Sequence, residues 1–332
     1  MTDQPNRAEQ APWTPEQAGV ALPREYMILP SSVPFVVPGF LRHARPTSFV
    51  QSPQMIECTE WFEQFVGRVE RAVGACHLPV CRMSDGEFLL LFGHQQPSLR
   101  HPFGTRLWLA ARQYAEIVRR RVRGFRAVTA KGVSSGAMSY AEIGVHTPIL
   151  STRYAEIARD GILAMHLSWG SNPFQEHYFP AVGRWLRDKN VVLTVDNYVP
   201  FYFVYGLLRG PTFSRLVAGC RLLVVHSATG PKREAILGSL RQAEPRSIEW
   251  LTISPTRSFA EILDLARLHD RPDLCLLGAG VGKANLFHQL APLAVPCLDA
   301  GYAFEAWADT DKQWDRPFMT PDTEFDPSRV RF

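Results

Sequence analysis

The last third of the chain alternates short apolar runs with helix-forming segments, and this alternation constrains the fold more than any other feature of the sequence. Buried strands are expected at 221–226, 249–253 and 273–277, and helices at 232–240, 259–268 and 283–290. Strands and helices that alternate at this spacing build units in which the strands lie parallel and helices cover both faces of the sheet. The sequence therefore predicts an α/β protein with a mainly parallel, Rossmann-like sheet.

The preceding part of the chain continues this pattern less regularly. Helices are expected at 55–75, 105–123 and 179–187, and strands at 78–81, 125–129 and 190–195. Tyr198, Phe201, Tyr202, Phe203 and Tyr205 are interpreted as the core-facing stripe of a helix. The segment 163–179, which contains His166, is open to two interpretations: a lining of a carbohydrate site, or an irregular surface loop.

Proline density sets the domain boundaries. Residues 1–53 form a proline-rich extension whose first twenty residues are expected to be disordered, because nine prolines exclude long helices: Pro5, Pro12, Pro15, Pro23, Pro30, Pro34, Pro38, Pro46 and Pro53. The folded domain is expected to span residues 54–310. Residues 311–332 are expected to form a C-terminal tail.

The overall charge excludes one class of partner. The chain has 36 basic and 32 acidic residues and a net charge of +4, too balanced to indicate a nucleic-acid-binding surface. The basic run Arg119–Arg123 is interpreted as a solvated helix face, with peripheral contact to a membrane surface as the alternative. No apolar run approaches the roughly 20 residues of a membrane-spanning helix. The six cysteines show no metal-binding spacing, which favours reduced thiols and a cytoplasmic location.

Two carboxylates flank a glycine where the strand at 78–81 ends. In the run from Arg82 through Ser84, Asp85 and Gly86 to Glu87, the two acidic residues are expected to face a cleft and to offer oxygen ligands to one Mn²⁺ or Mg²⁺ ion. Arg82 adds a fixed positive charge suited to phosphate. The alternative is that Ser84 or Asp85 caps a helix and that Glu87 is a first-turn carboxylate favoured by the helix dipole.

A second motif lies near the other end of the chain. Gly280, Gly282 and Lys283 occur where a strand passes into a helix, so backbone N–H groups and a lysine are available to an anion there. The alternative is a set of glycines that serves helix–strand packing. A strand then ends at Asp299, and Tyr302 and Glu305 follow it.

Together the two motifs resemble the GT-D class of glycosyltransferases. The resemblance is carried by Arg-x-Ser-Asp-Gly-Glu-Phe at 82–88 and by the glycine-rich loop, Asp-x-Gly and Glu-x-Trp within 277–307. It implies a GT-D fold and transfer of a sugar from a nucleotide diphosphate, with UDP-sugars as the leading donors, to a hydroxyl of a glycan or glycoconjugate. It also implies metal binding by Asp85 and Glu87, and donor binding by Arg82, Ser84, Asp85, Gly86, Glu87, Gly280, Gly282, Lys283 and Tyr302.

The chain departs from the family pattern after Asp299. Tyr302 stands where a histidine is expected, and the acidic–aromatic string is reduced to Phe304-Glu305-Ala306-Trp307. The donor sugar and the catalytic base are therefore open, with Asp299 and Glu305 as the candidates for the base. Two alternative functions remain: a metal-dependent phosphohydrolase or nucleotidyl transferase acting on a nucleoside phosphate, and a non-catalytic module that binds a nucleotide sugar.

Overall fold

The computed structural model describes residues 58–92, 140–167 and 178–315, with isolated positions between 107 and 115. The proline-rich extension 1–53, the strand expected at 125–129 and the basic run 119–123 lie outside the described residues. The same is true of most of the helix expected at 105–123 and of the tail from residue 316.

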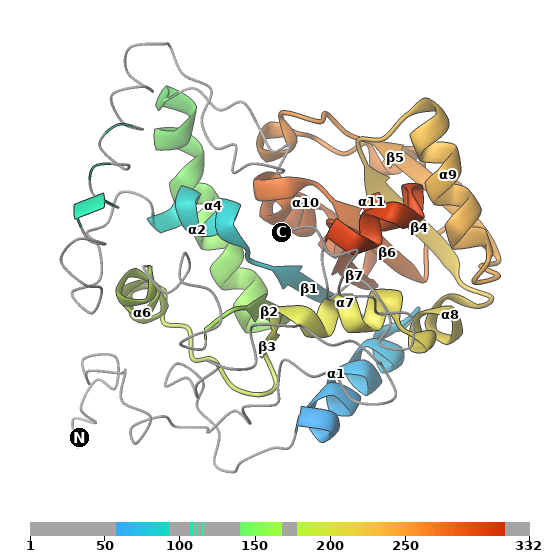
Figure 1. Ribbon diagram of the computed structural model, residues 1–332, viewed down its shortest axis with the longest axis horizontal. Coiled ribbons are helices and arrows are strands. Elements are labelled where there is room, and N and C mark those ends of the chain that lie inside the picture. The colour runs from blue at the N-terminus through green and yellow to red at the C-terminus, as the bar shows by residue number, and fades with distance from the viewer. Residues whose placement is uncertain are drawn as a thin grey trace.

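Seven parallel strands form the centre of the molecule (Figure 1). Their order across the sheet is β3-β2-β1-β7-β6-β4-β5, and every pairing among these strands is parallel. The strands are β1 (Leu78–Arg82), β2 (Ile162–Met165), β3 (Tyr198–Pro200), β4 (Arg221–His226), β5 (Ser247–Thr252), β6 (Leu274–Gly278) and β7 (Pro296–Asp299). The α/β, Rossmann-like fold class expected from the sequence is confirmed.

Helices form one layer on each side of the sheet. One layer contains α2 (Asp85–Phe92), α4 (Tyr140–Asp160), α6 (Phe179–Asp188) and α10 (Lys283–Leu290); within it α4 contacts α2, α10 and strands β1 and β2. The other contains α1 (Cys58–Ala72), α7 (Phe201–Arg209), α8 (Pro211–Val217), α9 (Gly230–Arg241) and α11 (Ala303–Ala308). Right-handed crossovers require this division, because the chain crosses the sheet in one direction through α9 and in the other through α10.

The sheet is buried on both faces, as its sequence predicts. The side chains of Leu222 to Val225 in β4 and of Leu274 to Leu277 in β6 are at most 1% exposed. Helix α1 adds an aromatic contact: the Trp61 ring lies 5.4 Å from that of Phe203 in α7, and its Nε1 donates to the carbonyl of Val195 at 3.0 Å. The amphipathic helix expected at 55–75 is thus confirmed at Cys58–Ala72, while residues 73–75 form a turn.

Two of the predicted elements are not observed. Residues 190–195 do not form a sheet strand, because the Asn197 side chain accepts from Thr194 N–H and donates to Val192 O and Ala158 O, which closes a turn. The third strand begins only at Tyr198. Residues 259–268 form no α-helix but two short 3₁₀ turns, η3 (Ser258–Ala260) and η4 (Leu265–Arg267). Side chains of Asn285 and Gln289 in α10 bind the carbonyl of Glu261 and tie this segment to the neighbouring helix.

Helix α4 and strand β2 received no prediction from the sequence. Helix α4 contains Pro148 in its interior, and β2 is only four residues long. The four residues of β2 are all buried, so part of the segment 163–179 belongs to the sheet. Residues 168–177 lie outside the described residues.

The chain leaves β1 and β7 toward opposite sides of the sheet. These strands are neighbours, yet β1 leads into α2 in the layer of α4, whereas β7 leads into α11, which packs on α9 in the other layer. Open α/β sheets bind ligands at the carboxyl ends of strands that diverge in this way. Among the described helices, none has the length and apolar character needed to cross a membrane.

Candidate functional site

Arg82 and Asp299 join the ends of the two central strands. Arg82 is the last residue of β1 and Asp299 the last residue of β7, 217 positions away in the sequence. The guanidinium donates from Nη2 to Asp299 Oδ1 at 2.8 Å and from Nε to the Asp299 carbonyl at 2.9 Å, and the Arg82 backbone N–H donates to Asp299 Oδ2 at 3.1 Å. Three hydrogen bonds therefore fix the relative position of the two strand ends.

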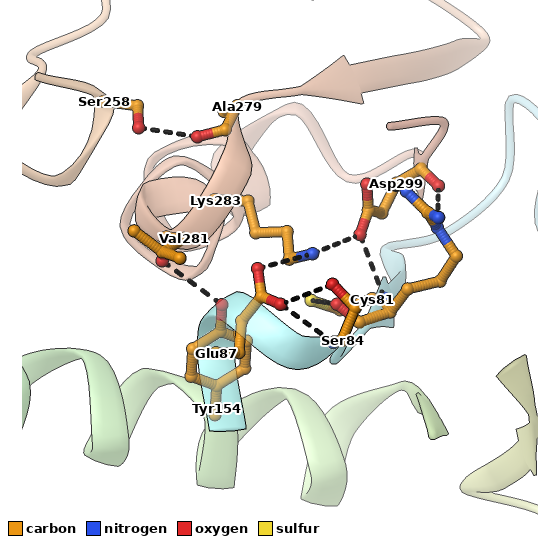
Figure 2. Close-up of polar contacts among 10 residues, drawn as sticks. Cys81, Ser84, Glu87, Tyr154, Ser258, Ala279, Val281, Lys283 and Asp299 are labelled. Atoms are coloured by element: carbon orange, nitrogen blue, oxygen red, sulfur yellow. Dashed lines mark hydrogen bonds and ion pairs between the residues drawn. The ribbon is translucent and has the colours of Figure 1, made fainter. Parts of the chain in front are cut away.

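Lys283 connects this pair to Glu87. Its Nζ lies 2.8 Å from Asp299 Oδ2 and 2.9 Å from Glu87 Oε1. Figure 2 shows the Lys283 side chain extending from the start of α10 between the two carboxylates. Lys283, Asp299 and the 82–87 corner therefore meet at one edge of the sheet, as expected from its parallel strands.

Glu87 also closes the first turn of α2. Its Oε2 accepts from the backbone N–H of Ser84 at 2.8 Å and from the Ser84 hydroxyl at 3.0 Å, while Phe88 N–H donates to the Ser84 carbonyl. This is the side-chain half of a capping box, in which a glutamate in the first turn satisfies the N–H of the cap residue. The capping alternative is thus observed, with Ser84 as the cap and Glu87 as the reciprocal carboxylate.

We call Arg82, Glu87, Lys283 and Asp299 the buried ion network. Their exposed fractions are 4%, 2%, 4% and 1%, and their two positive and two negative charges balance. Burial by itself lowers the pKa of Lys283, but the charges of Asp299 and Glu87 more than offset burial and hold this pKa above its ordinary value. Burial raises the pKa of Asp299, yet Arg82 and Lys283 bring it below the usual range. Lys283 and Asp299 are therefore both charged at neutral pH.

Aromatic rings and a glycine enclose the Arg82 guanidinium. Its central carbon lies 4.2 Å from the ring centre of Tyr205 and 5.2 Å from that of Phe201. On another side is Gly301, which has a φ of +44°, and a Cβ built there would lie 1.6 Å from Arg82 Nη2. Position 301, in the turn after β7, must therefore be glycine for the guanidinium to occupy this place.

The glycines of the second motif shape the turn that presents Lys283. Gly280 has a φ of +56°, and a Cβ at Gly282 would lie 2.2 Å from the backbone nitrogen of Phe259. The carbonyls of this turn are held from two sides, since Ser258 Oγ donates to Ala279 O at 2.6 Å and Tyr154 Oη donates to Val281 O at 3.3 Å (Figure 2). Gly282 thus serves close packing, the alternative reading of the motif.

The residues expected in the site divide into two sets by exposure. Buried residues are Arg82, Gly86, Glu87, Gly282, Lys283 and Asp299, and partly exposed residues are Ser84, Asp85, Gly280, Tyr302 and Glu305. Glu305, one of the two candidate bases, forms an ion pair with Lys232 at the start of α9. Asp299, the other candidate, has both carboxylate oxygens engaged by Arg82 and Lys283. A contact with a ligand is therefore available first to the partly exposed set.

A metal ion held directly by both Asp85 and Glu87 does not fit this arrangement. The two carboxylates do not face a cleft together, because Glu87 is buried and each of its oxygens already has a hydrogen-bond donor. Asp85 is partly exposed. Among the residues that the structure describes, no group of three or more histidine, cysteine or acidic side chains is arranged to hold a metal.

Two histidines lie at the same edge of the sheet. His226 was not expected in the site, whereas His166 belongs to the segment 163–179, for which the lining of a carbohydrate site was one of two interpretations. His226 ends β4; its Nδ1 accepts from Ala228 N–H at 3.0 Å, its ring lies 4.3 Å from that of Phe304, and burial lowers its pKa to about 4. His166 follows β2 and stacks on Phe201 at 4.6 Å, and burial lowers its pKa to about 3. The sequence signal for His226 was a histidine directly after an apolar run.

Comparisons with known proteins leave the chain without an assigned relative: no protein-family model, no curated protein and no solved structure matches it.

Proposed function

We propose that the chain is a glycosyltransferase that moves a sugar from a nucleotide diphosphate, with UDP-sugars as the leading donors, to a hydroxyl of a glycan or glycoconjugate. One observation carries this proposal. The two motifs that resemble the GT-D class, far apart in the sequence, are joined by direct contacts of Lys283 with Glu87 and of Arg82 with Asp299. They meet at the β1–β7 edge, where the chain diverges to opposite faces of the sheet.

Donor recognition is assigned to the partly exposed residues at this edge. Ser84 caps α2 and Asp85 is its first residue, Gly280 lies in the turn before α10, and Tyr302 follows β7. The buried ion network beneath them fixes the loops that carry these residues, and positioned groups stabilise developing charge better than mobile ones do. Arg82 and Lys283 act on the donor by holding these loops in place, because their own charges are balanced by Glu87 and Asp299.

A divalent ion would be bound by one carboxylate at this edge, that of Asp85. Glu305 is assigned the role of accepting the proton of the acceptor hydroxyl, because Asp299 is buried and fully bonded, whereas Glu305 is partly exposed. This assignment requires the ion pair with Lys232 to open when the acceptor binds.

A panel of UDP-, GDP- and CMP-linked sugars tests the donor. One nucleotide class should raise Tm, and nucleotide diphosphate should be released faster when a hydroxyl acceptor is present. Release of a nucleoside monophosphate from a UDP- or GDP-linked sugar, or release independent of any acceptor, would identify the phosphohydrolase or nucleotidyl transferase instead; a CMP-linked donor releases CMP in either case and is judged by its acceptor dependence alone.

Substitution of Asp85 tests the location of the site. We expect Asp85→Asn to weaken donor binding at least tenfold in the presence of Mn²⁺, with little change in Tm. The matched control is Asp196→Asn, which changes an exposed carboxylate in the turn before β3. Equal donor affinity in both variants would remove Asp85 from the site.

A non-catalytic nucleotide-sugar-binding module is the second candidate. It is favoured by the buried ion network itself, in which every carboxylate oxygen already has a partner within the protein. Donor binding without turnover across a panel of glycan acceptors would select this candidate.

A further inference from the structure

The position between Glu87 and Asp299 is a site for a cation, and the protein fills it with its own side chain. Glu87 lies in α2 and Asp299 ends β7, so their carboxylates come from different elements, and Lys283 Nζ is within 2.9 Å of an oxygen of each. Two carboxylates that converge on one point form the kind of oxygen ligand set that Mg²⁺, Mn²⁺ or Ca²⁺ uses.

We infer that Lys283 is the resident cation of the Glu87–Asp299 carboxylate pair, and that a divalent metal ion can occupy this position only when the Lys283 ammonium is removed. The inference concerns the cation that the pair holds, and it stands whether or not the chain transfers a sugar. It differs from the expectation for the two-carboxylate motif, in which Asp85 and Glu87 share a metal.

Charge balance supports exclusion of a metal while Lys283 is present. The network already contains two positive and two negative groups, all at most 4% exposed. A divalent ion added beside the ammonium would leave an uncompensated double positive charge in a region that water does not screen. The remaining network cation, Arg82, cannot make room, because its guanidinium is held by Asp299 and lies over Tyr205.

The turn before α10 fixes Lys283 in this position. Gly282 allows η5 (Gly280–Gly282) to pack directly on the backbone of Phe259, and the carbonyls of Ala279 and Val281 are bound by side chains of Ser258 and Tyr154. The Lys283 backbone is thus held from two directions, and its side chain is 95% buried. A lysine so placed gives the carboxylates a cation without any dependence on metal concentration.

Removal of the ammonium should convert the carboxylate pair into a metal site. We expect Lys283→Met to lower Tm in EDTA, and Mn²⁺ or Ca²⁺ without nucleotide to recover at least half of the loss. Electron paramagnetic resonance should show one Mn²⁺ ion bound to Lys283→Met. Its affinity should be at least ten times that of the wild type for Mn²⁺. Adding Glu87→Gln to Lys283→Met should abolish both effects.

Lys232→Met is the matched control. Lys232 also pairs with a glutamate near this edge of the sheet, but its side chain is 42% exposed. This variant should gain no Mn²⁺ binding. Gain of the same Mn²⁺ site in Lys232→Met would overturn the inference. It would show that loss of any positive charge near this edge creates the site, and that removal of Lys283 is not required.

A second comparison decides the question if Lys283→Met does not fold under any condition. This comparison is between the wild type and the single variant Glu87→Gln, both of which keep Lys283. The inference requires the two to bind Mn²⁺ with the same affinity, whereas a metal held by Glu87 beside Lys283 would be lost in the variant. Loss of Mn²⁺ binding in Glu87→Gln would therefore contradict the inference. Failure of every donor to bind would reject the proposed function and leave this result unaffected.

Discussion

Single residues at the β1–β7 edge are constrained by what their side chains touch. Gly301 is the clearest example, because its φ is +44° and the space where a Cβ would lie is filled by the Arg82 guanidinium. Two separate requirements therefore select glycine there: a backbone conformation that other residues rarely adopt, and the absence of a side chain.

Gly301→Ala should lower the free energy of unfolding by at least about 3 kcal/mol, because it adds backbone strain and displaces a buried charged group. Gly219→Ala is the control, since Gly219 also has a positive φ, +73°, but has no atom within 4 Å of the added Cβ. It should cost only about 1 kcal/mol. Urea unfolding measures both, and equal losses would show that contact with Arg82 has no energetic consequence.

His166 is predicted to make the protein sensitive to acid. Burial lowers its folded-state pKa to about 3, against 6.5 in the unfolded chain. Between these values the unfolded state binds the extra proton, so stability falls as pH falls, by about 1.4 kcal/mol for each pH unit contributed by this group. His166→Phe, which retains a ring beside Phe201, should reduce the slope of stability against pH between pH 6.5 and 4. An unchanged slope in His166→Phe would show that His166 is not a source of the acid sensitivity.

At the scale of elements, the turn between β6 and α10 shows how packing determines the position of a charged group. The 3₁₀ turn η5 packs against η3. The two backbones can approach this closely because Gly282 has no side chain between them. The backbone of Gly282 has an ordinary φ of −79°. Its requirement for glycine is therefore steric and not conformational.

Gly282→Ala should lower stability by about 2 kcal/mol, a cost typical of an added methyl group in a tightly packed position. Gly238→Ala, in α9, is the comparison, because nothing lies within 4 Å of its added Cβ. There alanine should stabilise the helix by up to about 1 kcal/mol. Thermal unfolding of both variants distinguishes them by sign. A stabilising Gly282→Ala would mean that η5 and η3 are not in close contact.

At the scale of the whole molecule, the buried ion network connects the two halves of the sheet. Arg82 belongs to β1, which leads outward to β2 and β3, and Asp299 belongs to β7, which adjoins β6 and the strands beyond it. Because the four charges sum to zero, removal of one leaves another uncompensated in the interior, and removal of an opposite pair does not.

The double variant Arg82→Met with Asp299→Asn should therefore be destabilised less than the sum of its single variants. We expect about 3–5 kcal/mol for each single substitution and a coupling of about 1–3 kcal/mol from the double-mutant cycle. The corresponding cycle at Arg221 and Asp273, an ion pair that is 33% and 22% exposed, should give a clearly smaller coupling. Strict additivity at Arg82 and Asp299 would contradict a shared network.

The fold class could be predicted from the sequence because it depends on local patterns. The run Arg221–His226 is almost continuously apolar, which is typical of a parallel strand that helices cover on both faces. The predicted boundaries of this strand and of α10 are those observed. The strand expected at 190–195 failed because the Asn197 side chain stabilises a turn through contacts that reach α4. The helix expected at 259–268 failed because this segment bonds to side chains of α10. In both cases contacts distant in sequence overrode local preference.

The sequence by itself determined which residue types lie at the carboxyl ends of the strands, since parallel strands place Arg82, Asp299 and the turn before Lys283 along one edge. Only the tertiary structure decided what these charges do. Whether Glu87 faces solvent beside Asp85 or turns inward to Lys283 depends on the position of α10 relative to α2. These helices are far apart in the sequence, because α2 ends at Phe92 and α10 begins only at Lys283. The cost of leaving a buried charge without a partner decides that arrangement, and this cost exists only once the chain has folded.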